Sequence, residues 1–462
     1  MRIRLGAALN LNEISIAAHG FCPPEIRNTY VECITTDTRD MEKGDLFIPL
    51  KGNNLDGERF CPLAIERGAF VISRFSYECA ITVDDTETAL LLIAKYYKNQ
   101  YLKDLKFTVG VTGSVGKTTT KEFLCTLCKE KYRSFCNEGN KNSIIGLPLT
   151  VLSCPTDCEA LILEMGMNHS HEIEKMSLTV EPNIGIITNI GLSHVGNLGS
   201  REKIASAKKE ILRGMGEGVV LCDIAEGLLA DLPNRITVST TDYSAVFYLR
   251  VIEYSFEGAY FDLYFREKCI KGLYCAFGAP HNLNNLSFAL CAFMLMGGRE
   301  EDIKRSLPSM ASVQKRNKII PLGAFTVYED CYNASFESII SAIKHIKMLN
   351  KPFSALIGDI YELGSYSEKI HKEIGKELFN LGARQIFTFG EYSKFIREGA
   401  LDAGMNEESI FINEDLSSPE ISARQIINAL NRGEILLIKG SNATKADRIT
   451  RLLQKELKND GQ

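Results

Sequence analysis

The fold is decided by Phe107-Thr-Val-Gly-Val-Thr-Gly-Ser-Val-Gly-Lys-Thr-Thr119, which joins an apolar run to a helical pattern through a glycine-rich loop. Residues 107–111 are typical of a short buried strand, and residues 117–132 place apolar side chains on one side of a helix. The glycines between them let backbone N–H groups approach an anion, and the amino terminus of a helix favours negative charge. The stretch therefore predicts a loop that binds nucleotide phosphates between a strand and a helix.

The side chains of the loop supply further parts of a phosphate site. Lys117 can reach the terminal phosphates, and the Thr118 hydroxyl would coordinate Mg²⁺. The spacing departs from the general P-loop, because that pattern puts its first glycine where this chain has Val111. Nucleotide binding is predicted, with an imperfect match to generic nucleoside triphosphatases, for Gly113, Ser114, Val115, Gly116, Lys117, Thr118 and Thr119.

Beyond the loop, strand patterns alternate with helix patterns. Such alternation predicts a parallel sheet covered by helices on both faces. Residues 246–276 differ, since their aromatic and β-branched runs indicate an antiparallel excursion. The other buried strands are expected at 160–163, 184–187 and 219–222, before an apolar helix at 282–296.

The flanking regions predict two more α/β units. Short apolar runs separated by turn signals fill the first hundred residues, and strand and helix patterns resume after Gly323 as a second doubly wound sheet. The first unit is expected to hold strands within 34–39, 44–49 and 70–73, and helices at 62–67 and 86–98. The last unit is expected to hold strands at 324–328, 353–357, 386–389 and 435–438, and helices at 336–349, 367–381 and 419–431. The chain is thus predicted to be an α/β protein of three domains, covering residues 1–102, 103–314 and 315–462.

Composition and charge exclude several classes of protein. The 462 residues are 45% hydrophobic and 24% charged, and the net charge of −5 gives no reason to expect a nucleic-acid partner. No apolar stretch approaches the length of a membrane span, and the first residues lack the features of a signal peptide. We therefore expect a cytoplasmic protein that does not insert into membranes. We also expect a monomer, although the sequence does not fix the oligomeric state.

Fourteen cysteines are spread along the chain, which favours reduced thiols over a disulfide scaffold. Cys125 and Cys128 form a C-x-x-C, which could be a redox pair or half of a zinc site. Because no second C-x-x-C and no nearby histidine accompany them, we expect both in the core, and we expect the same of Cys154 and Cys158.

Two polar residues follow buried strands. Glu164 closes the strand at 160–163, and His194 comes shortly after the strand at 184–187. The carboxyl ends of parallel strands face the ligand crevice, where a carboxylate could hold Mg²⁺. Either residue alone is more often structural, so the prediction rests on their convergence with the phosphate loop.

Several motifs occur in series with these residues: Gly139-Asn-Lys-Asn142, Glu164-Met-Gly166, Thr188-Asn-Ile-Gly191 with His194, and Ala207-Lys-Lys-Glu-Ile211. In this order the chain resembles the Mur ligases, most closely the type that adds D-alanyl-D-alanine to UDP-N-acetylmuramoyl-tripeptide. The resemblance extends to both ends through Asp37-Thr-Arg39, Gly44-Asp-Leu-Phe47, Asp56-Gly57, Glu329-Asp-Cys-Tyr-Asn-Ala334, Gly358-Asp-Ile-Tyr-Glu-Leu-Gly364, His371 and Lys439-Gly-Ser441. It implies an N-terminal domain that binds the UDP substrate, a central ATP-binding domain, and a Rossmann-like C-terminal domain that binds the incoming amine.

The resemblance also implies roles for single residues. Lys117, Lys208 and His194 would be catalytic, and Thr118 and Glu164 would hold one Mg²⁺. His194 would serve a second Mg²⁺ together with Lys208, which in most of the family carries a carbamate. The alternative for Lys208 is a solvated helix residue beside Lys209.

Further residues match nucleotide and substrate contacts of the family. His281, Asn282, Asn285, Arg316 and Asp330 would contact ATP, although Asn282 could equally cap the apolar helix. Substrate binding is implied for Asp37, Thr38, Arg39, Asn140, Asn142, Tyr332 and Asn333.

The expected reaction is a two-step ligation, in which ATP phosphorylates a carboxylate and the amine of D-alanyl-D-alanine then attacks the acyl phosphate. Four residues depart from the family pattern, namely Glu58, Ser335, Phe336 and Asn442. A ligase for a different amine or carboxylate therefore stays open, as do, less favourably, a P-loop switch and a nucleotide-binding pseudoenzyme.

Overall fold

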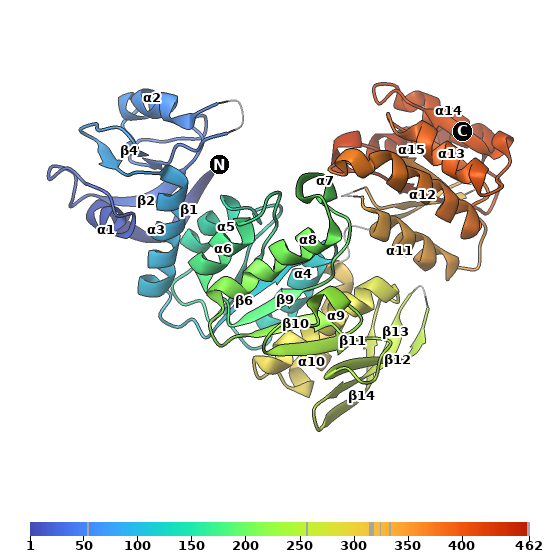
Figure 1. The fold of residues 1–462 in the computed structure, drawn as a ribbon, viewed down its shortest axis with the longest axis horizontal. Coiled ribbons are helices and arrows are strands. Elements are labelled where there is room, and N and C mark those ends of the chain that lie inside the picture. The colour runs from blue at the N-terminus through green and yellow to red at the C-terminus, as the bar shows by residue number, and fades with distance from the viewer. Residues whose placement is uncertain (53–54, 256, 314–317, 324, 332–333, 460–462) are drawn as a thin grey trace.

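The computed structural model describes residues 1–462 except 53–54, 256, 314–317, 324, 332–333 and 460–462. The strands of the described residues form three sheets, which lie in three α/β units (Figure 1). The predicted fold class, an α/β protein of three domains, is confirmed.

The N-terminal sheet has the strand order β1-β2-β3-β4-β5. β1 and β2 pair antiparallel, and the following neighbours pair parallel. The strands are Arg2–Asn10 (β1), Tyr30–Thr35 (β2), Leu46–Phe47 (β3), Phe70–Ser73 (β4) and Ala80–Thr82 (β5), and the helices are Leu11–Ala17 (α1), Cys61–Glu66 (α2) and Thr86–Tyr101 (α3).

The central sheet has the order β14-β13-β12-β11-β10-β9-β6-β8-β7. Its parallel part consists of Phe107–Thr112 (β6), Ser134–Cys136 (β7), Ala160–Glu164 (β8), Ile184–Ile187 (β9), Val219–Asp223 (β10) and Arg235–Ser239 (β11). The chain leaves β6 towards β7 on one side and crosses back to β9 on the other. The carboxyl end of β6 is thus a topological switch point, where open α/β sheets bind ligands.

The antiparallel excursion is confirmed as Phe247–Tyr254 (β12), Ala259–Phe265 (β13) and Lys268–Cys275 (β14). These strands extend the central sheet away from the switch point.

Helices cover both faces of the parallel part. Along β8, Leu161 and Leu163 join the apolar layer under α5, α6 and α8, whereas Ile162 joins the layer under α4 and α9. This period of two is expected of a strand buried on both faces. The helices are Lys117–Lys129 (α4), Gly146–Leu152 (α5), Glu172–Val180 (α6), Val195–Leu198 (α7), Arg201–Lys209 (α8), Pro280–Leu295 (α9) and Glu300–Ser306 (α10).

The C-terminal sheet has the order β15-β16-β20-β17-β18-β19, with the β15–β16 pair antiparallel and the others parallel. Its strands are Lys318–Leu322 (β15), Phe325–Glu329 (β16), Phe353–Gly358 (β17), Ile386–Phe389 (β18), Ile410–Asn413 (β19) and Ile435–Lys439 (β20). Its helices are Phe336–Lys347 (α11), Ser367–Asn380 (α12), Ser393–Asp402 (α13), Pro419–Ala429 (α14) and Asp447–Asn459 (α15).

Some element boundaries differ from the sequence expectations. The strand expected within 34–39 is Tyr30–Thr35, and the helix expected at 117–132 ends at Lys129. The suggestion that Asn282 caps the apolar helix is wrong. Pro280 starts that helix after Ala279, because its fixed φ and missing N–H suit the first helical position.

The cysteine prediction is confirmed for all four residues of the two pairs. Cys125, Cys128, Cys154 and Cys158 are buried in the apolar layers. Among the described residues, which include all fourteen cysteines, no disulfide forms.

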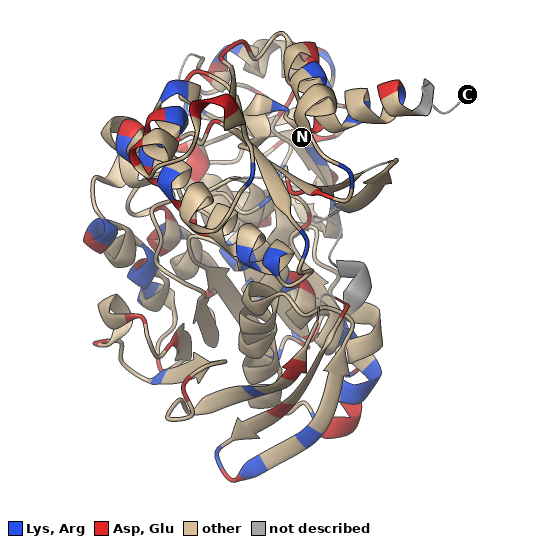
Figure 2. Cartoon of the chain, turned by 90° about the vertical axis from the view of Figure 1, so that its right-hand side faces the viewer, with Lys and Arg blue, Asp and Glu red and all other residues tan. Residues whose placement is uncertain are grey.

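Charges of both signs are mixed over the surface. Figure 2, viewed from the C-terminal side, shows Lys and Arg alternating with Asp and Glu along the helices. Within the described residues, no helix combines the length and apolarity needed to cross a bilayer.

The N-terminal and central units share buried contacts through α3. The Tyr97 hydroxyl donates a 2.8 Å hydrogen bond to the Cys154 carbonyl, and both groups are buried. Burial raises the pKa of Tyr97, so the phenol stays protonated and can donate. This bond fixes α3 to the end of α5.

We predict that Tyr97→Phe destabilises this junction, because it leaves the buried Cys154 carbonyl without its donor. Such a loss costs about 1–3 kcal/mol and should lower the melting temperature by at least about 2 °C in scanning calorimetry. Tyr243→Phe is the control, since that side chain is 85% exposed. Equal melting temperatures for both variants would contradict the prediction.

Candidate active site

The phosphate loop spans the turn between β6 and α4. Gly113 has φ +145° and Gly116 has φ +84°, conformations that disfavour side chains. A Cβ on Gly113 would overlap the Thr188 hydroxyl oxygen. The glycine spacing, which fits the general P-loop poorly, therefore suits the close approach of β9 to this loop.

Lys117 begins α4 and folds back over the loop. Its Nζ donates to the carbonyl oxygens of Gly113, at 2.8 Å, and Ser114, at 3.2 Å. The ammonium thus lies at the amino terminus of α4, where backbone N–H groups and the helix dipole favour an anion.

Glu164 lies beside this loop, at the carboxyl end of β8. One carboxylate oxygen accepts a 2.6 Å hydrogen bond from the Thr118 hydroxyl, and the other accepts a 2.7 Å bond from the Asn142 amide. Asn137 fixes the Glu164 backbone, accepting from its N–H and donating to its carbonyl at 2.9 Å each. The carboxylate is buried, so its orientation is well defined.

These oxygens fit one Mg²⁺. A hydroxyl and a carboxylate are ligands that Mg²⁺ prefers, and the ion usually completes its shell with water and substrate phosphates. Within the described residues, no group of three His, Cys, Asp or Glu gathers as a metal cluster. The Thr118–Glu164 pair would supply two ligands, and nucleotide phosphates and water would supply the rest.

The loop after β9 braces the phosphate loop. The Asn189 amide accepts from the Val115 N–H at 3.0 Å and donates to the Val115 carbonyl at 2.9 Å. The Thr188 hydroxyl donates to the same carbonyl at 2.6 Å, and the Gly191 N–H donates to the Ser114 hydroxyl at 2.8 Å. The segment 188–194 is called the brace loop below.

Lys208 is not a solvated helix residue. It is 1% exposed on α8, whereas the neighbouring Lys209 pairs with Asp231 at 2.5 Å. Burial holds the pKa of Lys208 well below its usual value, and the positive charge of Lys117 lowers it further. The amine is therefore biased towards its neutral, nucleophilic form.

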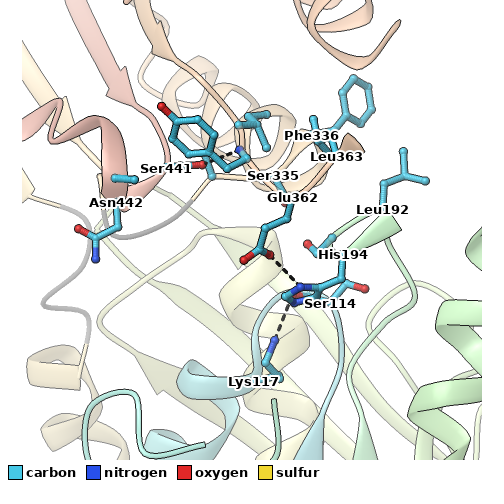
Figure 3. A pocket seen from close by; sticks show the side chains of 15 residues that line it. Ser114, Lys117, Leu192, His194, Ser335, Phe336, Glu362, Leu363, Ser441 and Asn442 are labelled. Carbon is cyan, nitrogen blue, oxygen red and sulfur yellow. Dashed lines mark hydrogen bonds and ion pairs between the residues drawn. The ribbon is translucent and has the colours of Figure 1, made fainter. Parts of the chain in front are cut away.

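His194 ends the brace loop and faces the C-terminal domain. Its Nδ1 lies 2.8 Å from a carboxylate oxygen of Glu362 (Figure 3). This contact lowers the pKa of Glu362, which keeps the carboxylate ionised. A cavity of about 260 Å³ surrounds the pair, lined by Ser114, Lys117, Leu192, Ser193, His194, Ala334, Ser335, Phe336, Ile360, Tyr361, Glu362, Leu363, Ser441, Asn442 and Ala443.

The residues implied for ATP from α9 lie at the boundary between the central and C-terminal domains. The Asn285 amide occupies the space beside Gly116, and Asn282 is buried one turn earlier. His281 packs against His345 with ring centroids 6.2 Å apart, and burial lowers the pKa of His281 to about 4. The negative charge of Asp330 partly opposes this lowering of the His281 pKa, and Asp330 forms an ion pair with Lys439.

Other implied residues lie elsewhere. Asp37, Thr38 and Arg39 belong to the N-terminal unit, where Asp37 pairs with Arg39 at 2.6 Å. Asn140 lies in an exposed turn, although Asn142 reaches Glu164. Arg316, Tyr332 and Asn333 lie outside the described residues.

One departure from the family pattern has a local structural role. Glu58 is buried and accepts from the Ser73 hydroxyl at 2.7 Å and the Arg74 N–H at 2.8 Å. It therefore fastens the turn after Asp56 to the end of β4.

Sequence reasoning missed several residues of this site. Asn137, Asn189, Glu337 and Glu362 make the contacts that orient the phosphate loop and its neighbours. Asn189 and Glu362 lie within recognised motifs, which was the available signal. Asn137 and Glu337 carried no pattern of their own.

The chain is similar to known proteins over most of its length. Residues 111–293 match the family model described as Mur ligase middle domain, and residues 30–89 match the one described as Mur ligase family, catalytic domain. The chain is 34% identical over 451 residues to the UDP-N-acetylmuramoyl-tripeptide--D-alanyl-D-alanine ligase of Bacillus subtilis, covering 93% of this chain and 94% of that relative.

Solved structures are similar over nearly the full length. MurF from Acinetobacter baumannii has a TM-score of 0.88 at 25% identity, covering 98% of this chain and 100% of that chain. MurF ligase from Thermotoga maritima in complex with ADP shares the fold, with a TM-score of 0.81 at 24% identity over 92% of this chain and 98% of that chain.

We predict that Gly113→Ala weakens ADP binding by at least about tenfold, which corresponds to 1.4 kcal/mol, because its Cβ would push Thr188 away from the loop. Isothermal titration calorimetry measures this loss. Gly227→Ala is the control, since a Cβ there meets open space. Unchanged affinity in a folded Gly113→Ala protein would refute this account of the loop.

Proposed function

The chain belongs to the Mur ligase family, and on that premise we propose that it uses ATP to join D-alanyl-D-alanine to UDP-N-acetylmuramoyl-tripeptide in the cytoplasm. The observation that carries the proposal is that Lys117 and the Thr118–Glu164 pair meet at the phosphate loop, while the buried Lys208 lies within electrostatic reach of Lys117. The curated relative of Bacillus subtilis bears the name of that reaction.

The chemistry follows in two steps. The substrate carboxylate attacks the γ-phosphorus of ATP, giving an acyl phosphate and ADP. The amine of the dipeptide then attacks the acyl carbon, loses a proton and expels inorganic phosphate. Lys117 stabilises the negative charge on the transferring group, and Mg²⁺, when bound, neutralises charge on the phosphate oxygens.

We assign Thr118 and Glu164 to the first Mg²⁺ site, and His194 and Lys208 to the second. Lys208 suits the second site once its neutral amine has added CO₂ and released a proton, because the resulting carbamate is an anionic oxygen ligand. With this modification, the two sites would each supply anionic oxygen ligands to one Mg²⁺.

The N-terminal and C-terminal domains supply the other two reactants. We assign Asp37, Thr38 and Arg39 to the UDP substrate, and Asn140 and Asn142 to its peptide end near Glu164. Arg316 and Asp330 would complete the ATP site together with His281, Asn282 and Asn285. Tyr332 and Asn333 would hold the incoming amine.

A second candidate differs in the amine. Ser335, Phe336 and Asn442, which depart from the usual pattern, all line the cavity beside Lys117 and His194. Phosphate release with UDP-N-acetylmuramoyl-tripeptide and a panel of dipeptides and amino acids distinguishes the two. Turnover with D-alanyl-D-alanine well above all others supports the first, whereas a different best amine supports the second.

We predict that Lys117→Ala lowers ligation by at least about 10²-fold, the usual scale for losing one preorganised charge partner. ADP release coupled to product formation measures it, with circular dichroism to establish folding. Lys129→Ala is the matched control, because Lys129 lies in the last turn of the same helix. Near-normal ADP release from folded Lys117→Ala protein would reject the assignment.

We predict that Lys208→Ala also abolishes ligation, and that short carboxylates such as acetate restore part of it by replacing the carbamate oxygens. The activity of Lys208→Ala is titrated with acetate, and Lys117→Ala is treated identically. No rescue of Lys208→Ala, or equal rescue of both variants, would argue against a carbamate on Lys208.

A further inference from the structure

We propose that Glu337 and Glu362 of the C-terminal domain are positioning residues, which hold the brace loop and, through it, the phosphate loop in the arrangement used for ligation. The inference rests on the proposed function for its kinetic consequence, but the contacts themselves are independent of the substrates. Glu337 contacts the brace loop at Leu192, and Glu362 contacts it at His194 (Figure 3 shows the Glu362 contact).

The Glu362 contact joins two residues in an unusual backbone conformation. His194 has φ +66° and Glu362 has φ +67°, both in the left-handed region that non-glycine residues rarely adopt. The Glu362 carboxylate lies 2.8 Å from His194 Nδ1, and its carbonyl accepts from the Gly196 N–H at 3.0 Å. Such strained conformations persist only where their surroundings hold them, and they gather at functional sites.

This contact also restrains the orientation of the His194 ring. The carboxylate lies beside Nδ1, so it restrains the orientation of the ring, whose Nε2 is on the opposite side. Glu362 thereby orients a side chain that belongs to the active site, although it lies on another domain.

The Glu337 contact is made to backbone instead. Glu337 lies in the first turn of α11, and one of its carboxylate oxygens accepts a 2.9 Å hydrogen bond from the Leu192 N–H. A Cβ on Gly191 would lie only 2.7 Å from that same oxygen and 3.2 Å from the other. The acid therefore packs directly on the peptide between Gly191 and Leu192.

Hydrogen bonds connect that peptide to Ser114 of the phosphate loop. The Gly191 N–H donates to the Ser114 hydroxyl at 2.8 Å, and the Ser114 N–H donates to the Asn189 carbonyl at 3.1 Å. A C-terminal domain that moved away would remove Glu337 and Glu362 from the brace loop together. Phosphate-loop geometry is thus tied to docking of the domain that is expected to bring the amine.

The two acids act through different chemistry, which makes them separable. Glu337 needs only an acceptor oxygen, so Glu337→Gln preserves its role and Glu337→Ala removes it. Glu362 presents a charge to His194, so Glu362→Gln weakens its role. The Glu362 side chain of this pair is half exposed, and such exposed ion pairs add little to the free energy of unfolding.

The test measures steady-state ligation for these three variants with Glu373→Gln, an exposed residue of the same domain, as control. We expect Glu337→Ala and Glu362→Gln to lower kcat by about 10- to 100-fold, the scale of a small misplacement of reacting groups. KM for the UDP substrate should stay unchanged, and Glu337→Gln and Glu373→Gln should stay within about twofold of wild type. Unchanged kcat in Glu337→Ala and Glu362→Gln would overturn the proposal.

Amide hydrogen exchange of residues 188–194 separates this inference from the proposed reaction. Exchange at Leu192 should accelerate by at least about tenfold in Glu337→Ala but not in Glu337→Gln, whatever the substrates are. If the wild-type protein fails to ligate but the two Glu337 variants still differ in exchange at Leu192, the proposed function is refuted and the positioning contacts remain supported. Equal exchange in both Glu337 variants would refute the positioning role.

Discussion

The carboxyl ends of three adjacent parallel strands bring the phosphate loop, Glu164 and the brace loop to one edge of the central sheet. β6 ends in the phosphate loop, β8 ends at Glu164, and β9 leads into the brace loop. Because the strands are buried on both faces, their ends cannot shift independently of the apolar layers beneath them. Thr188 and Asn189 therefore have fixed positions. Their hydrogen bonds with Val115 restrict the conformation of the phosphate loop more than its glycines could.

The electrostatics at this edge of the sheet depends on two lysines and one buried carboxylate. Burial lowers the pKa of Lys208, and the positive charge of Lys117 lowers it further, while Lys117 stays hydrogen-bonded to loop carbonyls. The two oxygens of the buried Glu164 carboxylate accept hydrogen bonds from Thr118 and Asn142. A site of this composition favours ligands that carry several negative charges, which polyphosphates do.

The sequence predicted the buried parts best. The strands at 70–73, 184–187 and 386–389 have the bounds that their apolar runs indicate, because parallel strands covered on both faces are continuously hydrophobic. β1 was missed, since its Gly6-Ala-Ala8 stretch lacks the β-branched residues of a strand pattern. Of the site, the loop and Glu164 followed from local pattern. Glu337 and Glu362 did not, because their partners are more than a hundred residues distant and belong to another domain.

The paired left-handed residues have a consequence for anyone who engineers this protein. Glycine at position 194 or 362 would relieve backbone strain, so a selection that rewards heat resistance alone would accept it readily. Such a selection would enrich chains that fold well and work poorly, with no warning from expression yield. Libraries built on this scaffold are better designed with both positions held constant.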